Sequence, residues 1–160
     1  MVATKKMQNK ITAAAKDVLL APVYLYQGHK IKRDTVRLPE PNGERHGQVQ
    51  LNNSPITSKG KSNNILNLMV VGDSAAAGVG SQTQQEALVG HLIPILTEQA
   101  AIQSAFDTLN WSLQATTGYT SFDILRRLYV LPAPSQPIDV MVLSVGVNDT
   151  TSKVSAARWQ

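Results

Sequence analysis

The sequence predicts an α/β protein in which a parallel β-sheet lies between layers of helices, a three-layer α/β/α arrangement. Three observations predict it. Short runs of Leu, Met, Val and Ile have the continuous apolar character of strands buried in a parallel sheet. Helical patterns alternate with these runs along residues 66–145, with glycines or prolines between the segments. Right-handed crossovers between successive parallel strands then place helices on both faces of the sheet.

Length and composition indicate one domain with its own core, since the chain has 160 residues. It contains no cysteine, which excludes a disulfide framework and a thiolate metal site made by these residues. No run approaches the ~18 apolar residues of a transmembrane helix, and no signal peptide is predicted. We therefore expect a cytoplasmic protein, with peripheral contact at the inner face of the membrane left open.

Charge divides the chain into two parts. Residues 1–61 carry 11 lysines and arginines against 4 aspartates and glutamates, whereas residues 62–160 carry 4 against 7. This predicts a basic N-terminal helix and arm over 1–61, followed by the α/β domain over 62–160. The basic part is either a solvated leader or a segment that contacts an anionic membrane surface. No nucleic-acid partner is expected.

The first part of the chain is expected to hold one short helix and an extended arm. Apolar side chains recur at helical spacing in residues 11–20, which predicts an amphipathic helix that ends near Pro22. Residues 27–61 are rich in Gly, Pro, Asn and charge, so little regular structure is expected there. His29 and His46 lie in this arm without a second ligand at metal-binding spacing, and no metal site is predicted.

A first strand and a long helix are expected next. The apolar run of the strand stops at Gly72. A helix is predicted over residues 83–101, because Thr83 and Glu86 form a capping-box pattern at its start. Pro94 should kink this helix. The side chains expected to face the sheet are those of Ala87, Leu88, Leu92, Ile95 and Leu96.

Two further strands and a helix complete the pattern. The second strand is expected over residues 109–115 and the third over residues 138–145. Residues 120–129 between them have a helical pattern, and Thr120 with Asp123 can cap the start of that helix.

Ser74 lies where ligands bind in open α/β sheets, in the turn between the carboxyl end of a strand and a helix. A hydroxyl there is accessible and close to unpaired backbone N–H groups. Gly72-Asp73-Ser74 has three interpretations: a tight turn without chemistry, a phosphate cradle, or a turn that presents a serine nucleophile. Asp73 is expected to be a turn or capping residue rather than an acid or a base.

Two later turns carry residues that match the third interpretation. The second strand leads to Gly118, and the third ends in Gly146-Val147-Asn148-Asp149. Together with Gly72-Asp73-Ser74, these blocks resemble in order those of the SGNH (GDSL-like) hydrolase family. The resemblance covers about residues 66–149. It implies a flavodoxin-like parallel sheet and an esterase- or lipase-type activity on small-molecule or lipid esters, with no metal or organic cofactor.

The resemblance also implies a role for each matched residue. Ser74 would be the nucleophile. Its own N–H, the N–H of Gly118 and the side-chain amide of Asn148 would form the oxyanion hole. Both residue types suit this role, because Gly118 has no Cβ to block approach to its N–H and an Asn amide offers N–H donors without net charge. The supporting motif positions are Gly72, Asp73, Gly146 and Asp149. Asp149, like Asp73, is expected to be a turn or capping residue rather than an acid or a base.

No general base is identified in this chain. The family uses a histidine with an aspartate three residues before it, and none of the three histidines has that aspartate. A helix is expected from Thr151 onward, and two further strands implied by the resemblance would lie beyond Gln160. We therefore expect a truncated hydrolase domain with weak or no ester hydrolysis. Its third strand would form an exposed apolar sheet edge that favours aggregation.

Two other functions stay open on the same residues. A carbohydrate O-acetylesterase or a thioesterase would use the same serine on a different ester. A non-catalytic, flavodoxin-like binding module would use the Gly-Asp-Ser turn to hold a phosphate. The acyl and alcohol specificity and the oligomeric state are not predicted.

Overall fold

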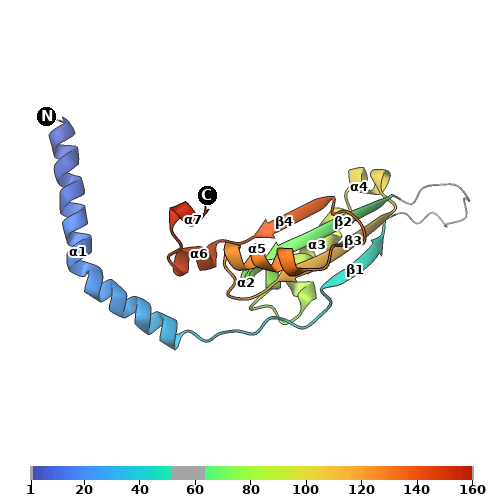
Figure 1. Ribbon diagram of the computed structural model, residues 1–160, viewed down its shortest axis with the longest axis horizontal. Helices are drawn as coiled ribbons and strands as arrows, with labels where there is room; N and C mark the ends of the chain where they lie inside the picture. The colour runs from blue at the N-terminus through green and yellow to red at the C-terminus, as the bar shows by residue number, and fades with distance from the viewer. Residues whose placement is uncertain (1, 52–63, 160) are drawn as a thin grey trace, which may run out of the picture. The chain divides into compact units, whose positions relative to one another are not determined.

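The computed structural model describes residues 2–51 and 64–159 (Figure 1). The chain separates into two compact units, residues 1–37 and residues 38–160, which are described one at a time. The boundary expected after residue 61 therefore moves to residue 37, because the segment that follows supplies a strand to the sheet. The last part of the expected arm, residues 52–63, lies outside the described residues.

The N-terminal unit is one long helix, α1 (Val2–Asp34), followed by a short extended tail. The expected end near Pro22 is wrong, since the helix continues through this proline. A proline removes one backbone hydrogen bond and crowds the carbonyl four residues earlier, which kinks a helix without always ending it. Figure 1 shows α1 changing direction part-way along. The side chains of Val18 and Leu19 are exposed.

None of the described helices is both long enough and apolar enough to cross a membrane.

The second unit is built on a four-stranded mixed sheet in the order β1-β3-β2-β4. The central strand β2 (Ile65–Gly72) pairs in parallel with β3 (Thr108–Ala115) on one side and with β4 (Val140–Ser144) on the other. These are the three parallel strands that the sequence predicts. β1 (His46–Gln50) adds an antiparallel strand outside β3, in a segment that we expected to be irregular.

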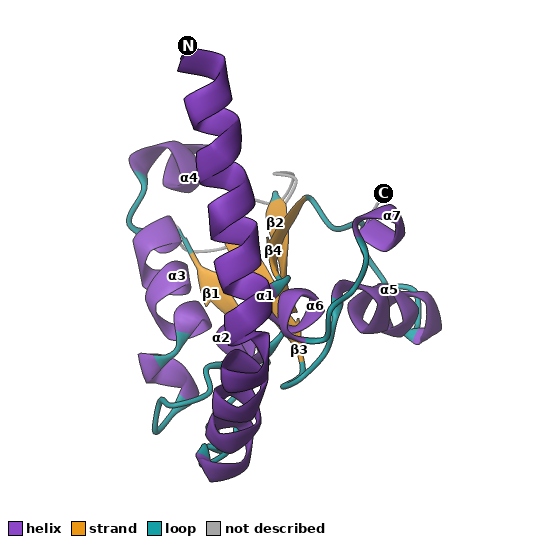
Figure 2. Cartoon of the chain, turned by 90° about the vertical axis from the view of Figure 1, so that its left-hand side faces the viewer, coloured by secondary structure: helices purple, strands orange, loops and turns teal. Residues whose placement is uncertain are grey.

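Helices cover both faces of this sheet, which confirms the α/β class. Figure 2 shows α3 and α4 on one side of the strands and α5 on the other. The connection from β2 to β3 contains α2 (Ser74–Ala77), the 3-10 helix η1 (Gln84–Glu86), α3 (Leu88–Thr97) and α4 (Ala100–Ala105). The connection from β3 to β4 contains α5 (Ser121–Val130), and β4 is followed by α6 (Val147–Thr151) and α7 (Ala156–Trp159).

The single helix predicted over residues 83–101 is wrong, because an extended residue, Ala87, separates η1 from α3. Thr83 makes no side-chain cap bond. The carboxylate of Glu86 instead accepts a hydrogen bond from the N–H of Gln82 at 3.2 Å. The later start rotates the helix relative to its expected face, so that Leu88 and Ile95 are exposed. The buried side chains of α3 are Val89 and Ile93.

The core lies on the α2–α3 side of the sheet. Alternate residues of β2 and β3 point into it, and the buried ones are Leu66, Leu68, Val70, Leu109, Leu113 and Ala115. The opposite face begins with a polar pair, in which Asn110 donates from Nδ2 to Oδ1 of Asn67 at 3.1 Å. This alternation places the apolar layer beneath α2. Because α2 packs on that layer, the turn that leads into α2 is held in place.

Candidate active site

The turn after β2 is the centre of the candidate site. Asp73 is the N-cap of α2, and its Oδ1 accepts a hydrogen bond from the N–H of Ala75 at 3.1 Å. The expected capping role of Asp73 is therefore confirmed. Gly72 is required by close approach, because an added Cβ would lie 2.1 Å from the carbonyl oxygen of Ser144. The hydroxyl-bearing residue Ser74 is the first residue of α2 and is half-buried.

Asp73 is almost fully buried, with 1% of its surface exposed. Its second carboxylate oxygen, Oδ2, has no hydrogen-bond partner among the described residues. Burying a polar atom without a partner costs free energy, so the turn keeps this carboxylate at some expense in stability.

The three predicted site residues lie at one edge of the sheet. Ser74 follows β2, Gly118 follows β3, and Asn148 follows β4. The strands end at the same level, because Gly72 pairs in register with the last residues of β3 and β4. The carboxyl ends of neighbouring parallel strands share one edge of a sheet, and ligands of open α/β folds bind there.

Hydrogen bonds join the turn after β2 to both neighbouring strands. The N–H of Asp73 donates to the carbonyl oxygen of Ser144 at 3.0 Å. On the other side, the N–H of Thr116 donates to the carbonyl oxygen of Gly72 at 3.1 Å. The turn that carries Ser74 is therefore fixed relative to the turns that carry Gly118 and Asn148.

The turns after β3 and β4 are also joined to each other. Asn148 donates from Nδ2 to the carbonyl oxygen of Tyr119 at 2.9 Å. Asp149, with 1% of its surface exposed, accepts from the N–H of Ser121 at 2.9 Å and from its hydroxyl at 2.7 Å. Asp149 thus caps the start of α5, as expected of a turn or capping residue. One hydrogen of the Asn148 amide is used here and a second is left.

Gly118 and Gly146 have positive φ angles, of 85° and 131°. An added Cβ at Gly118 would meet nothing within 4 Å, so conformation rather than crowding calls for glycine there. We expected a glycine that keeps space open above its N–H. The observed φ provides a different reason for the same residue.

Two backbone donors at this edge are unused. Within the described residues, the N–H groups of Ser74 and Gly118 donate no hydrogen bond, and the hydroxyl of Ser74 has no partner. Unpaired N–H groups at strand ends are suited to receive negative charge.

No histidine is bonded to Ser74 in the part of the chain that the structure describes. His46 begins β1 and pairs with Ser112, in the middle of β3, while His91 is an exposed residue of α3. His29 belongs to the N-terminal unit. No group of histidine, cysteine, aspartate and glutamate residues within the described ranges could hold a metal ion.

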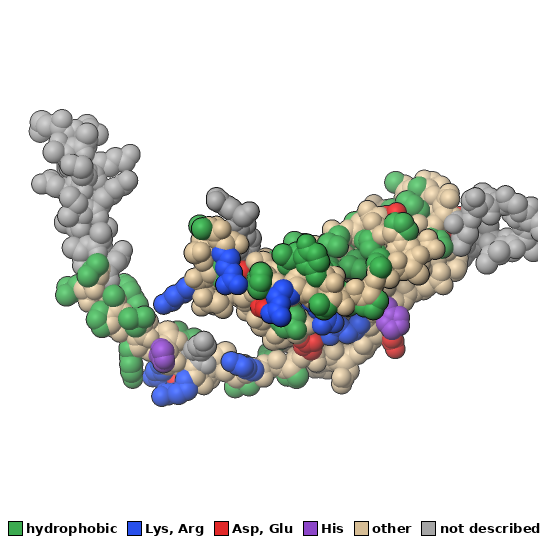
Figure 3. Space-filling view, in the orientation of Figure 1, with side chains coloured by type: hydrophobic (Ala, Val, Ile, Leu, Met, Phe, Trp, Pro, Cys, Tyr) green, Lys and Arg blue, Asp and Glu red, His purple; other side chains and the backbone are tan. Residues whose placement is uncertain are grey.

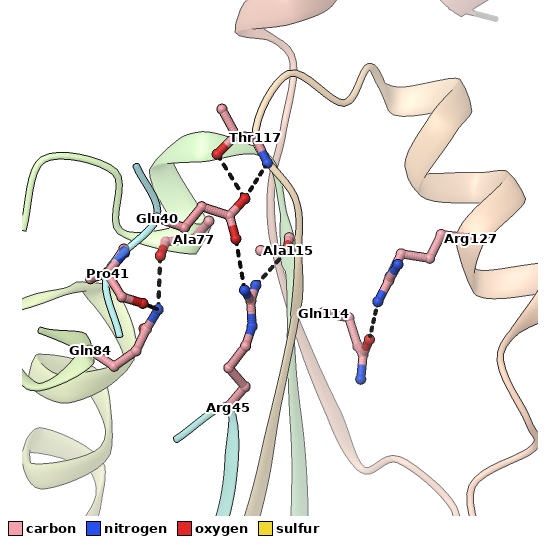
Figure 4. Close-up of polar contacts among 9 residues, drawn as sticks. All are labelled: Glu40, Pro41, Arg45, Ala77, Gln84, Gln114, Ala115, Thr117 and Arg127. Atoms are coloured by element: carbon pink, nitrogen blue, oxygen red, sulfur yellow. Dashed lines mark hydrogen bonds and ion pairs between the residues drawn. The ribbon is translucent and has the colours of Figure 1, made fainter. Parts of the chain in front are cut away.

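The sequence analysis missed one polar cluster beside the site (Figure 4). Glu40 accepts from the N–H of Thr117 at 2.7 Å and from its hydroxyl at 2.8 Å, both at Oε1. Oε2 of Glu40 accepts from Nη1 of Arg45 at 2.8 Å, and Nη2 of Arg45 donates to the carbonyl oxygen of Ala115. Partial burial acts to raise the pKa of Glu40, but the bonds from Thr117 and Arg45 outweigh it and lower the pKa.

A scan against family models and searches of curated proteins and of solved structures found no match to this chain.

Proposed function

We propose that this edge of the sheet is the nucleophile and oxyanion-hole part of a serine ester hydrolase of the SGNH type. One observation carries the proposal: three turns that resemble the family's blocks meet at one edge and are hydrogen-bonded to one another. The order of the three parallel strands, with the first in the centre, also supports it. This is the order at the start of a flavodoxin-like sheet, with its switch point at β2.

The chemistry follows from the donors at this edge. The Oγ of Ser74 attacks the ester carbonyl carbon, and its proton passes to a general base that is yet to be identified. The carbonyl oxygen gains negative charge and is stabilised by the N–H groups of Ser74 and Gly118 and by the second amide hydrogen of Asn148. Collapse of this intermediate expels the alcohol and leaves an acyl-serine, which water then hydrolyses. No step needs a metal or an organic cofactor.

The substrate class is a small-molecule or lipid ester, as an esterase or lipase-type activity requires. Carbohydrate O-acetylesters and thioesters undergo the same steps, and a panel of acetylated sugars, medium-chain aryl esters and acyl thioesters distinguishes them.

The first experiment is covalent labelling of Ser74. With imidazole supplied as an external base, a fluorophosphonate probe should attach to this residue in the 160-residue chain, as read by peptide mass spectrometry. Labelling should be lost in Ser74→Ala and kept in Ser104→Ala, whose serine is exposed on α4. Saturable binding of a nucleotide or flavin, with no labelling at position 74, would replace the hydrolase by a phosphate-binding module.

A second experiment supplies the base from solution. Imidazole should raise the Ser74-dependent hydrolysis of a short-chain aryl ester, with Ser74→Ala measuring the direct reaction of imidazole with the ester. Without imidazole we expect weak turnover. Robust Ser74-dependent turnover without imidazole would show that this chain supplies its own base and would overturn the expectation that the base is missing.

A further inference from the structure

We propose that Glu40 and Arg45 are positioning residues of this site and hold the Gly118 turn (residues 116–120) in the conformation that presents the Gly118 N–H to the substrate. The inference rests on the proposed function for its catalytic meaning. The contacts that carry it lie within the second compact unit and are drawn in Figure 4.

Glu40 and Arg45 bind the chain on both sides of Thr116. Glu40 receives both the N–H and the hydroxyl of Thr117, whereas Arg45 donates to the carbonyl oxygen of Ala115. The two side chains are also paired with each other at 2.8 Å. A carboxylate that accepts a backbone N–H and is paired with a guanidinium makes charge-assisted hydrogen bonds, which are stronger than neutral ones.

Thr116 and Tyr119 are bonded to Gly72 and Asn148, but within the described residues no hydrogen bond other than those to Glu40 reaches Thr117, and none reaches Gly118. Gly118 is exposed, donates no backbone hydrogen bond within the described residues, and has open space where a side chain would be. Only one bond closes the turn on itself, from the N–H of Tyr119 to the carbonyl oxygen of Thr116 at 3.3 Å. The conformation at Thr117 and Gly118 therefore depends on the polar contacts that Glu40 makes.

The ion pair between Glu40 and Arg45 is partly buried, so it can contribute to holding the Gly118 turn. The side chains of Arg45 and Glu40 are 35% and 28% exposed, so water screens the pair less than a fully exposed one. Arg45 is itself held at the start of β1, because its carbonyl oxygen accepts from the N–H of Leu113 at 2.7 Å. The pairing of β1 with β3 therefore places the guanidinium of Arg45 at the end of β3.

The segment 40–45 is also connected, through Gln84, to the helix that begins with Ser74. Gln84 donates from Nε2 to the carbonyl oxygen of Ala77, the last residue of α2, at 3.0 Å. The backbone N–H of Gln84 donates to the carbonyl oxygen of Asn42 at 3.0 Å. Residues 40–45 thus link the end of α2 to the Gly118 turn, and so relate the nucleophile to one of its oxyanion donors.

The test compares Glu40→Ala, Glu40→Gln and the matched control Glu44→Gln, which changes an exposed carboxylate of the same segment. For each variant, the fluorophosphonate labelling of Ser74 is measured in the presence of imidazole over a range of probe concentrations. In Glu40→Ala we expect the rate constant at saturating probe to fall about tenfold or more, since one oxyanion donor contributes about 10²–10³. The half-saturating concentration should change little.

Partial rescue separates positioning from general destabilisation. Glu40→Gln keeps an oxygen that can accept from Thr117 but loses the charge that pairs with Arg45, so its labelling rate should lie between those of wild type and Glu40→Ala. Glu44→Gln should label as wild type does. Amide hydrogen exchange at Thr117, whose N–H is bonded to Glu40, should be faster in Glu40→Ala, with exchange in the β2–β3 ladder unchanged.

The two proposals fail in different ways. If wild type labels at Ser74 and Glu40→Ala labels equally fast with unchanged exchange at Thr117, the positioning role is overturned and the hydrolase proposal stands. If no variant labels at Ser74, the proposed function fails. Faster exchange confined to the Gly118 turn in Glu40→Ala would then still show that Glu40 holds this turn, and unchanged exchange would overturn that as well.

Discussion

The two outer strands of the sheet, β1 and β4, differ in their direction and in the polarity of their side chains. β1 is antiparallel to its neighbour and consists mainly of polar residues, with Val49 its one large apolar side chain. β4 is parallel to its neighbour, and Val140, Met141 and Leu143 are 45%, 48% and 59% exposed. Figure 3 shows apolar side chains gathered over β4 and α5. A polar edge resists pairing with other chains, whereas an apolar one invites it.

The difference extends to the candidate site, which each outer strand serves in a different way. β1 carries Arg45 to the Gly118 turn by means of side-chain bonds. β4 instead packs its backbone directly against the turn before Ser74. We expect side-chain substitutions on the β1 side to tune the site and backbone crowding on the β4 side to disrupt the fold.

The largest expected effect is crowding at the β2–β4 contact. In Gly72→Ala the new Cβ would lie 2.1 Å from the carbonyl oxygen of Ser144, and backbone cannot turn aside as a side chain can. We expect a loss of about 2–3 kcal/mol in the free energy of unfolding, measured by urea denaturation. The matched change on β1, Gly47→Ala, meets the side chain of Trp111 at 2.8 Å and should cost less. Equal costs would contradict the comparison.

A smaller effect is expected from a charge on the apolar edge. Leu143→Lys should raise the concentration at which the chain self-associates by about tenfold, because burying a leucine is worth about 1.5–3 kcal/mol. Gln48→Lys, on the polar strand β1, should have no such effect. Light scattering after size-exclusion chromatography over a range of concentrations measures both. A wild-type chain that stays monomeric at high concentration would refute the expected association.

Lowering the pH should reduce the stability that the Glu40 carboxylate contributes beside β1. The pKa of Glu40 is lowered in the folded state, so its contribution is present above the ordinary pKa of a glutamate and is lost as the pH falls through the lowered value. We expect wild type to lose about 1 kcal/mol more than Glu40→Gln between pH 6 and pH 3. Urea unfolding at each pH tests this. Parallel pH profiles would show that the Glu40 carboxylate contributes no stability.

The smallest expected effect distinguishes two threonines that look alike in sequence. Thr120 forms a reciprocal capping box with Asp123, whereas Thr83 makes no cap bond. Thr120→Ala should cost about 1 kcal/mol and Thr83→Ala nearly nothing, by urea denaturation. Hydrogen bonds from Thr120 also lower the pKa of Asp123, so the cost of Thr120→Ala should shrink at acid pH.

The parallel strands and their turns were predictable because the signal for each lies in a few consecutive residues. An apolar run such as that of β2 signals a buried strand by itself, and the small residues after it signal a turn. The capping box at Thr120 was predictable for the same reason, since its two members are three residues apart. Of the candidate site, the sequence placed Ser74, Gly118 and Asn148 in turns at strand ends.

What was missed depends on partners far away in the sequence. β1 has little apolar signal of its own and forms because its polar backbone pairs with β3, where His46 lies opposite Ser112. Glu40 lies in the segment that we expected to be irregular, and nothing near it in the sequence reveals that Thr117 will be its donor. The break at Ala87 was missed because Thr83 and Glu86 matched a cap that the folded backbone does not use.

The separations along the chain also set the order in which the site can form. Asp73 and Ala75, whose bond caps the helix of the nucleophile, are two residues apart, so this capping bond needs no distant partner. Glu40 and Thr117 are 77 residues apart, and closing so long a loop costs more conformational entropy. During synthesis, Glu40 leaves the ribosome long before its partner does. We therefore expect the bond between Glu40 and Thr117 to form later in folding than the cap at Asp73.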